Sequence, residues 1–276
     1  MIMDKQNQQN IILCIPGVWQ NHSALLQALL THDTGYIYAG LIIKALASDY
    51  FAEIEEHKND PKVSQVFRQQ SMDRFSEQEL QEIEQHPMVI YVICEAGSIA
   101  LAQQALLLGQ ALLKAGGLAI KVETSGVTHL RADWLNFDAE NLFDLYKAFI
   151  PTVFDQDSLY SCGMHQFGKA DGCINLKVEH ASYVLNQFLL YLLIENPTLL
   201  ENQTFSVEEG AEVLKLHKKQ SSDFFEEDSL YFNRWGVWSL KPSFSLKMKK
   251  PCKCTGLTSI KQQSNYVKHN AEYRLP

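Results

Sequence analysis

The stretch from Met88 to Val122 constrains the fold more than any other part of the sequence. Met88–Cys94 (MVIYVIC) is a continuous apolar run, which is typical of a central strand that is covered on both faces. A long uncharged segment follows Gly97-Ser98 and ends at Gly116-Gly117, as expected of a helix with a glycine C-cap. Leu118–Val122 (LAIKV) predicts a second strand. Strand, helix and strand at this spacing predict a βαβ crossover.

The region before this unit carries further signals of regular structure. Ile11–Val18 (IILCIPGV) predicts a buried strand, because it is apolar, rich in β-branched residues and interrupted by Pro16-Gly17. Tyr36–Ala47 predicts a strand that runs into a helix, since its start is strand-like and Lys44 onward is compatible with a helix. Three helix starts are predicted from capping residues: Asn21, Asp60-Pro61, and Ser76 with Glu79 as a capping box.

The pattern changes beyond Pro151. An apolar helix is predicted at Glu179–Glu195, and strands at Leu159–Phe167, Ile174–Leu176, Thr204–Val207, Glu212–His217 and Phe232–Leu240. We therefore predict an α+β fold, in which a mixed β-sheet of about six to eight strands has flanking helices. Two intimately packed lobes are expected: residues 1–150 as an α/β lobe that contains the βαβ unit, and residues 151–246 as an α+β lobe. Residues 247–276 form a basic tail.

The charge of the chain is unevenly distributed. Residues 1–240 hold 16 Lys+Arg and 31 Asp+Glu, a balance of −15, whereas residues 241–276 hold 8 Lys+Arg and one acid, a balance of +7. An acidic body repels phosphate backbones, so we expect no nucleic-acid partner. The same charge attracts a basic protein, because opposite potentials speed encounter. Solubility alone is the alternative explanation for the acidic body.

Targeting signals and cysteine usage indicate a cytoplasmic protein. Met1–Asn10 lacks the basic and apolar regions of a secretory signal. The longest uncharged run, Ala96–Leu113, contains Ser98 and three glutamines, so we expect a buried helix and no membrane span, which needs about 20 mostly apolar residues. Six cysteines in a chain without a signal indicate reduced thiols.

Cys162 and His165 form the first candidate catalytic site. A nearby imidazole activates a thiol as a nucleophile, and Asp171 could orient the histidine. On a regular strand these two side chains point to opposite faces, so they converge only if Gly163 makes a bulge. The alternative is a structural pair of buried side chains.

The spacing of Cys162, His165, Cys173, Cys252 and Cys254 does not fit a zinc site, so we predict no metal and no cofactor.

A second candidate site follows the strand at Leu118–Val122. Lys121 and Glu123 are two residues apart, so their side chains share one face of the strand. His129 and Arg131 follow a Ser-Gly turn. The carboxyl ends of parallel strands are where open α/β sheets bind ligands, so these four residues are a candidate ligand pocket. The alternative is a Lys–Glu pair on a solvated face.

A third candidate is a partner-binding surface in the acidic and aromatic segment from Asp223 to Trp238. Acids steer a basic partner toward a surface, and aromatic side chains anchor it. The alternative is that the tryptophans belong to the core. The candidate residues are Asp223, Glu226, Glu227, Asp228, Trp235 and Trp238.

Two segments resemble a known bacterial family. Ala115–Trp134 (AGGLAIKVETSGVTHLRADW) and Tyr160–Asp171 (YSCGMHQFGKAD) resemble segments of the family called domain of unknown function 4261, over roughly residues 87–240. The resemblance implies a bacterial cytosolic protein that is often encoded beside secretion or toxin-related genes. Together with the acidic body, it leads us to expect an immunity protein, of the kind found in toxin–antitoxin pairs, that neutralises a basic toxin or effector by direct binding. The alternative is a small-molecule enzyme that uses Cys162 and His165 or the strand end at residues 121–133.

Overall fold

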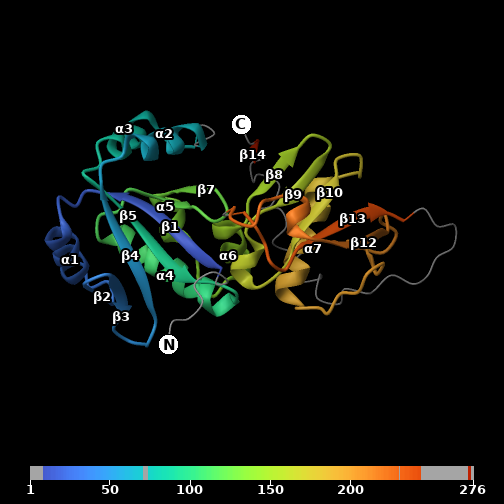
Figure 1. Cartoon of the computed structure of the whole chain (residues 1–276), viewed down its shortest axis with the longest axis horizontal. Helices are drawn as coiled ribbons and strands as arrows, with labels where there is room; N and C mark the ends of the chain where they lie inside the picture. Colours follow the sequence, from blue (N-terminus) through green and yellow to red (C-terminus); the bar gives the residue numbers. More distant parts are fainter. Residues whose placement is uncertain (1–8, 71–73, 230, 244–272, 275–276) are drawn as a thin grey trace. The chain divides into compact units, whose positions relative to one another are not determined.

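The computed structural model describes residues 9–70, 74–229, 231–243 and 273–274 (Figure 1). The chain divides into two compact units, which we call unit 1 and unit 2. Unit 1 comprises Met1–Phe149 and Gln166–Gly168, and unit 2 comprises Ile150–His165 and Lys169–Pro276. Each unit combines helices with a seven-stranded sheet, so the predicted α+β class is confirmed. The strands form two sheets instead of the single sheet expected.

The sheet of unit 1 is antiparallel at every pair of neighbouring strands. Its spatial order is β2-β3-β4-β5-β1-β6-β7. The strands are β1 (Asn10–Gly17), β2 (Tyr36–Ala39), β3 (Ile42–Ala45), β4 (Phe51–Lys58), β5 (Met88–Glu95), β6 (Ala119–Val122) and β7 (Val127–Leu130).

Three helices of unit 1 begin where capping residues predict. Asn21 caps α1, Ser98 caps α4, and Ser76 with Glu79 forms a complete capping box on α3. These starts are predictable because a cap depends on only three or four consecutive residues. The helices are α1 (His22–Thr31), α2 (Pro61–Gln70), α3 (Glu77–Glu84), α4 (Ile99–Lys114), α5 (Arg131–Asn136) and α6 (Leu142–Phe149).

The predicted strand–helix–strand unit is present, but its two strands are not neighbours. β1 lies between β5 and β6 and is antiparallel to both, so β5 and β6 are parallel with one strand between them. The connection through α4 is therefore a split βαβ unit. Sequence spacing identifies the helix and the two strands but not the strand that inserts between them.

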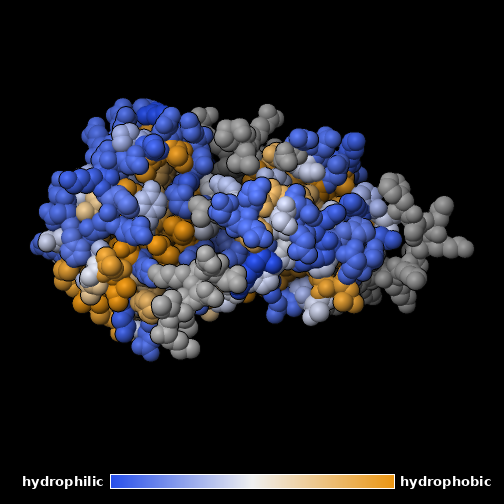
Figure 2. Space-filling model, in the orientation of Figure 1, coloured by the Kyte–Doolittle hydropathy of each residue, from blue (hydrophilic) through white to orange (hydrophobic). Residues whose placement is uncertain are grey.

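The expected strand-to-helix transition over Tyr36–Ala47 is wrong. β2 and β3 form a hairpin, and Gly40 at its turn has φ +68°, a conformation that favours glycine. The alternating side chains of β4 complete this part of the sheet. Figure 2 shows hydrophobic surface gathered over β2 and β3. The exposed apolar side chains there are Ile37, Leu41, Ile42, Leu46 and Phe51.

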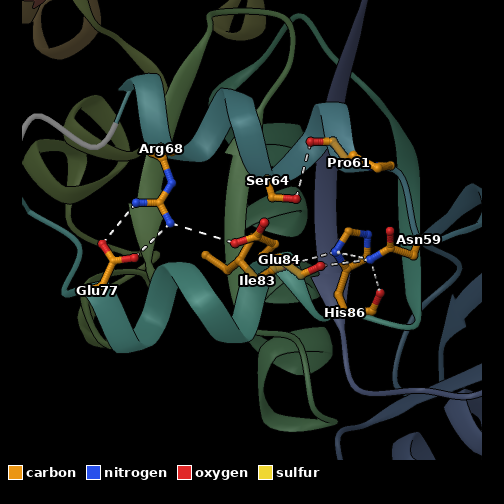
Figure 3. Close-up of polar contacts among 8 residues, drawn as sticks. All are labelled: Asn59, Pro61, Ser64, Arg68, Glu77, Ile83, Glu84 and His86. Atoms are coloured by element: carbon orange, nitrogen blue, oxygen red, sulfur yellow. Dashed lines mark hydrogen bonds and ion pairs between the residues drawn. The ribbon is translucent and has the colours of Figure 1, made fainter.

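α2 and α3 cover part of one face of the unit 1 sheet. Phe67 of α2 and Ile83 of α3 pack in a core with Val89 of β5. Arg68 donates two 3.0 Å hydrogen bonds to Glu77, which ties the two helices together (Figure 3). At one end of the helix pair, Asn59 donates hydrogen bonds to the backbone oxygens of Glu84 and His86, at 3.0 and 2.6 Å. These contacts hold the helix pair against the ends of β4 and β5.

The sheet of unit 2 is mixed, with the order β11-β12-β13-β10-β9-β8-β14. The pairs β10–β13 and β8–β14 are parallel. Gly172 of β10 lies against Leu185 of α7 (Ala181–Ile194), so this helix covers one face of the sheet. The strands are β8 (Thr152–Asp155), β9 (Ser158–Ser161), β10 (Asp171–Asn175), β11 (Thr204–Phe205), β12 (Leu214–Lys219), β13 (Val237–Pro242) and β14 (Tyr273–Arg274).

The strand expected at Leu159–Phe167 ends early. β9 stops at Ser161, Gly163 has φ +108°, and Met164–Phe167 forms the short 3₁₀ helix η2. A second 3₁₀ helix, η3, spans Ser221–Asp223.

Of the predicted basic tail, only the two residues of β14 are among the described residues. No helix in the described part of the chain is long and apolar enough to cross a membrane.

Candidate functional site

The chain reversal after β9 buries the first candidate site. Cys162 is 3% exposed, His165 is 1% exposed and Asp171 is 3% exposed. Burial and the nearby charge of Asp171 raise the pKa of the Cys162 thiol. A thiol with a raised pKa holds its proton at neutral pH, so it is a poor nucleophile.

His165 does not complete a catalytic pair with Cys162. Among the hydrogen bonds of the described residues, none joins the two side chains, and Nδ1 of His165 is buried without a partner. Burial lowers the pKa of His165 to about 4, so the imidazole is neutral at pH 7. Sequence proximity therefore does not produce the thiolate–imidazolium arrangement that a nucleophilic cysteine needs.

Asp171 bonds to other groups instead of to His165. One carboxylate oxygen accepts hydrogen bonds from Oγ of Ser161 at 2.8 Å and from the backbone N–H of Met164 at 3.2 Å. The other accepts from Nδ2 of Asn233 at 2.6 Å. Burial raises the pKa of Asp171 to about 6, and the hydrogen bonds from Asn233 and Ser161 oppose that rise. The carboxylate joins three segments of unit 2 and orients no catalytic histidine.

No metal centre emerges among the described residues. No group of three His, Cys, Asp or Glu side chains there is close enough to hold an ion. Cys173 is buried at 8% exposure on the same face as Cys162. Cys252 and Cys254, which complete the set considered from the sequence, lie outside the described residues.

Lys121 and Glu123 share one face of the unit 1 sheet and form an ion pair. Their side chains are only 12% and 18% exposed. In register, Lys121 lies beside Cys14 of β1, which in turn lies beside Tyr91 of β5. Burial, with the charge of Glu123, raises the pKa of Cys14, and burial also raises that of Tyr91. The pair is therefore part of a half-buried polar row across the sheet.

His129 and Arg131 lie away from this row. His129 pairs with Ile120, so its side chain points to the opposite face of the sheet from Lys121. Its Nε2 is 2.9 Å from the backbone oxygen of Ala148, and burial lowers its pKa to about 3. Arg131 is exposed at the start of α5. The four residues thus do not converge on one pocket, because the strands at this end are antiparallel instead of parallel.

The acidic segment, defined here as Asp223–Asp228, lies on the surface of unit 2. Asp223, Glu226, Glu227 and Asp228 are exposed, and none takes part in the ion pairs formed by the described residues. Phe225 holds the segment in place, because its ring lies 5.9 Å from that of Tyr160 and 5.9 Å from that of Tyr231. These rings cover the face of the sheet opposite α7.

The aromatic residues predicted beside these acids differ in exposure. Trp238 is 8% exposed, and Nζ of Lys218 lies 4.7 Å from its ring centroid, so it belongs to the core and not to the surface. Trp235 is half-buried under the guanidinium of Arg234 at 4.3 Å. Sequence reasoning missed Phe224, which is 42% exposed between Asp223 and Phe225. The signal in the sequence is the pair of adjacent phenylalanines among the acids, of which the structure exposes Phe224 and packs Phe225.

No protein family, curated protein or solved structure was found to match the chain.

Proposed function

We propose that the chain is a protein-binding protein that captures a basic partner, and specifically an immunity protein that neutralises a toxin or effector by direct binding. The observation that carries this proposal is the acidic segment itself. Four exposed carboxylates lie in the same six-residue segment as the exposed Phe224, and Phe225 packs this segment against the sheet. A fixed acidic surface with an exposed aromatic side chain suits a basic partner, because the charges steer encounter and the ring anchors the complex.

The charge of the whole body favours the same partner. Residues 1–240 carry a balance of −15, so a cationic protein is attracted before any contact forms. The resemblance to domain of unknown function 4261 implies that this partner is a toxin or effector encoded nearby. The enzyme alternative gains no support from Cys162, because that thiol is buried with a raised pKa and has no hydrogen bond to His165.

A capture experiment followed by kinetics tests the proposal. The full chain is immobilised, a protein is captured from the lysate of the native bacterium, and its association rate is measured at increasing salt. Charge reversal at the three central acids (Glu226→Lys, Glu227→Lys, Asp228→Lys) is expected to lower the association rate at least about tenfold at low salt, since steering changes this rate most.

A matched variant separates local from global charge. Glu208, Glu209 and Glu212 are three exposed acids elsewhere in unit 2, and reversing them changes the net charge by the same amount. This control is expected to slow association much less. A partner that binds both triple variants at the wild-type rate across all salt concentrations shows that the acidic segment is not the interface. Turnover of a small molecule, with no protein captured, favours the enzyme.

A further inference from the structure

In the described part of unit 1, one edge strand of the sheet is covered by other residues and the other is not. At one edge, Arg74 donates a 2.8 Å hydrogen bond to the backbone oxygen of Thr128 in β7, and Oγ1 of Thr128 donates to the oxygen of Gln70 at 3.4 Å. Gln70 at the end of α2 and Arg74 therefore cover β7. In unit 2, β14 likewise pairs with the outer side of β8. Covering an edge strand prevents it from pairing with another chain.

No described strand pairs with the opposite edge of the unit 1 sheet, at β2. The N–H of Leu46 bonds to the oxygen of Gly35 at 2.9 Å, so by antiparallel alternation Ile37 exchanges the next pair of bonds with Lys44. The backbone N–H and C=O groups of Tyr36 and Tyr38 then point away from the sheet. Among the described residues, no hydrogen bond reaches these groups. The strand (YIYA) has no charge, proline or bulge that would discourage pairing.

Apolar side chains flank this edge. Ile37 on β2 is 39% exposed, Ile42 on β3 is 36% exposed and Leu46 just beyond β3 is 66% exposed. They lie on one face of the sheet, with the small residues Gly35 and Ala39 beside them. Lys44 lies on the same face opposite Ile37, and its ammonium forms a 3.6 Å ion pair with Asp49. Figure 2 shows hydrophobic surface over β2 and β3. Backbone pairing at the edge and apolar contact beside it are thus available at the same place.

We infer that β2 is a self-association edge, which pairs antiparallel with β2 of a second copy of this chain. The outward backbone N–H and C=O groups of Tyr36 form hydrogen bonds with those of Tyr38 in the second copy. Two-fold symmetry repeats this pair of bonds between Tyr38 and Tyr36 of the second copy. Ile37 then lies on the axis, directly opposite Ile37 of the second copy, in a non-hydrogen-bonded pair with Cα atoms about 4.5 Å apart. Ile42 of each copy faces Leu46 of the other across Ala39 and Gly35.

A second copy fits this edge better than the basic partner proposed for unit 2. The strand is uncharged, so it lacks the feature that selects a basic protein, and two-fold symmetry doubles every contact. A four-residue strand with three flanking side chains buries on the order of 500 Å² per copy, less than the roughly 800 Å² per partner of a standard interface. The dimer is therefore weak and reversible, and forms as concentration rises.

Cysteine cross-linking tests both the contact and its register. In the full chain with Cys252→Ser and Cys254→Ser, Ile37→Cys is expected to give a disulfide-linked dimer under mild oxidation, because the paired Cα distance suits a disulfide. Leu41→Cys is the matched control. Leu41 is 78% exposed, twice as much as Ile37, but at about 3.3 Å per residue the two hairpin tips lie more than about 20 Å apart. It is expected to cross-link at least about tenfold more slowly.

Sedimentation of the unmodified protein supplies the second measurement. Wild type is expected to shift from monomer to dimer with concentration, and Ile37→Lys is expected to raise the dissociation constant at least about tenfold while circular dichroism stays unchanged. High salt leaves this dimer intact, unlike the basic complex of unit 2, so each proposal can fail alone. Cross-linking of Leu41→Cys as fast as Ile37→Cys, a strictly monomeric wild type, or an Ile37→Lys dimer as strong as wild type overturns the inference.

Discussion

Nδ2 of Asn233 lies 2.6 Å from Oδ2 of Asp171, although 62 residues of chain separate them. The same nitrogen donates to the backbone oxygen of Lys169 at 2.9 Å, and the backbone N–H of Asn233 donates to Oγ of Ser221 at 2.9 Å. Ser221 begins η3, which leads into the acidic segment, and Asn233 follows that segment. One buried pair thus fixes both sides of the surface proposed to bind a partner.

We predict that Asn233→Ala destabilises unit 2 strongly. The substitution leaves the buried Asp171 carboxylate without one of its donors, and an unsatisfied charged group costs about 3 kcal/mol. The free energy of unfolding in urea measures the loss. Asn175→Ala is the control, because that side chain caps an exposed turn through Lys177 and is expected to cost less than about 1 kcal/mol. Equal costs for the two variants contradict a special role for the pair.

We predict that Asp171 makes stability fall as pH rises. Its folded pKa of about 6 exceeds the unfolded value of about 3.9, so the folded state binds more protons between these values. The resulting stabilisation is complete below pH 4 and is lost as pH rises through 6, about 3 kcal/mol in all.

Asp171→Asn isolates this contribution, because asparagine does not ionise. Urea unfolding between pH 4 and 7 is expected to show the falling component in wild type and not in the variant, whatever the absolute stability of the variant. Parallel curves for the two proteins argue against a raised pKa at Asp171.

The parts of this fold that were predictable depend on local signals. Ser76 and Glu79 satisfy each other's backbone amides within one turn, so their helix start is legible in the sequence. The insertion of β1 between β5 and β6 is not, because strand order depends on contacts between residues far apart in the chain. The same limit explains Trp238, whose aromatic ring suits a surface or a core equally until its neighbours are known.

We predict that Cys162 is unreactive in the folded protein. With Cys252→Ser and Cys254→Ser in place, the four remaining thiols are buried, so a thiol reagent is expected to modify the chain only on unfolding. Cys162→Ser buries a hydroxyl and is expected to cost about 1–3 kcal/mol, while partner capture is unchanged. Cys162→Ala controls for the loss of volume without the hydroxyl. Loss of biological activity in a folded Cys162→Ser protein points instead to a catalytic thiol.

His165 is predicted to make the protein less stable in acid. Burial holds its folded pKa at about 4, below the unfolded value of about 6.5, so the unfolded state binds more protons between these values and stability is lost as pH falls from 6.5 to 4. The loss between pH 8 and pH 5 amounts to about 2 kcal/mol. His165→Leu removes it, together with the unpartnered Nδ1.

Urea unfolding at pH 8 and at pH 5 measures this difference. In His165→Leu, the decrease in the free energy of unfolding from pH 8 to pH 5 is expected to shrink by about 2 kcal/mol. Part of the remaining decrease comes from His129, whose pKa is also lowered. Leu189→Met, at a fully buried position in the same unit, changes both values equally because neither side chain titrates. If His165→Leu retains the whole wild-type drop, the buried imidazole is protonated in the folded state and the acid sensitivity originates at other residues.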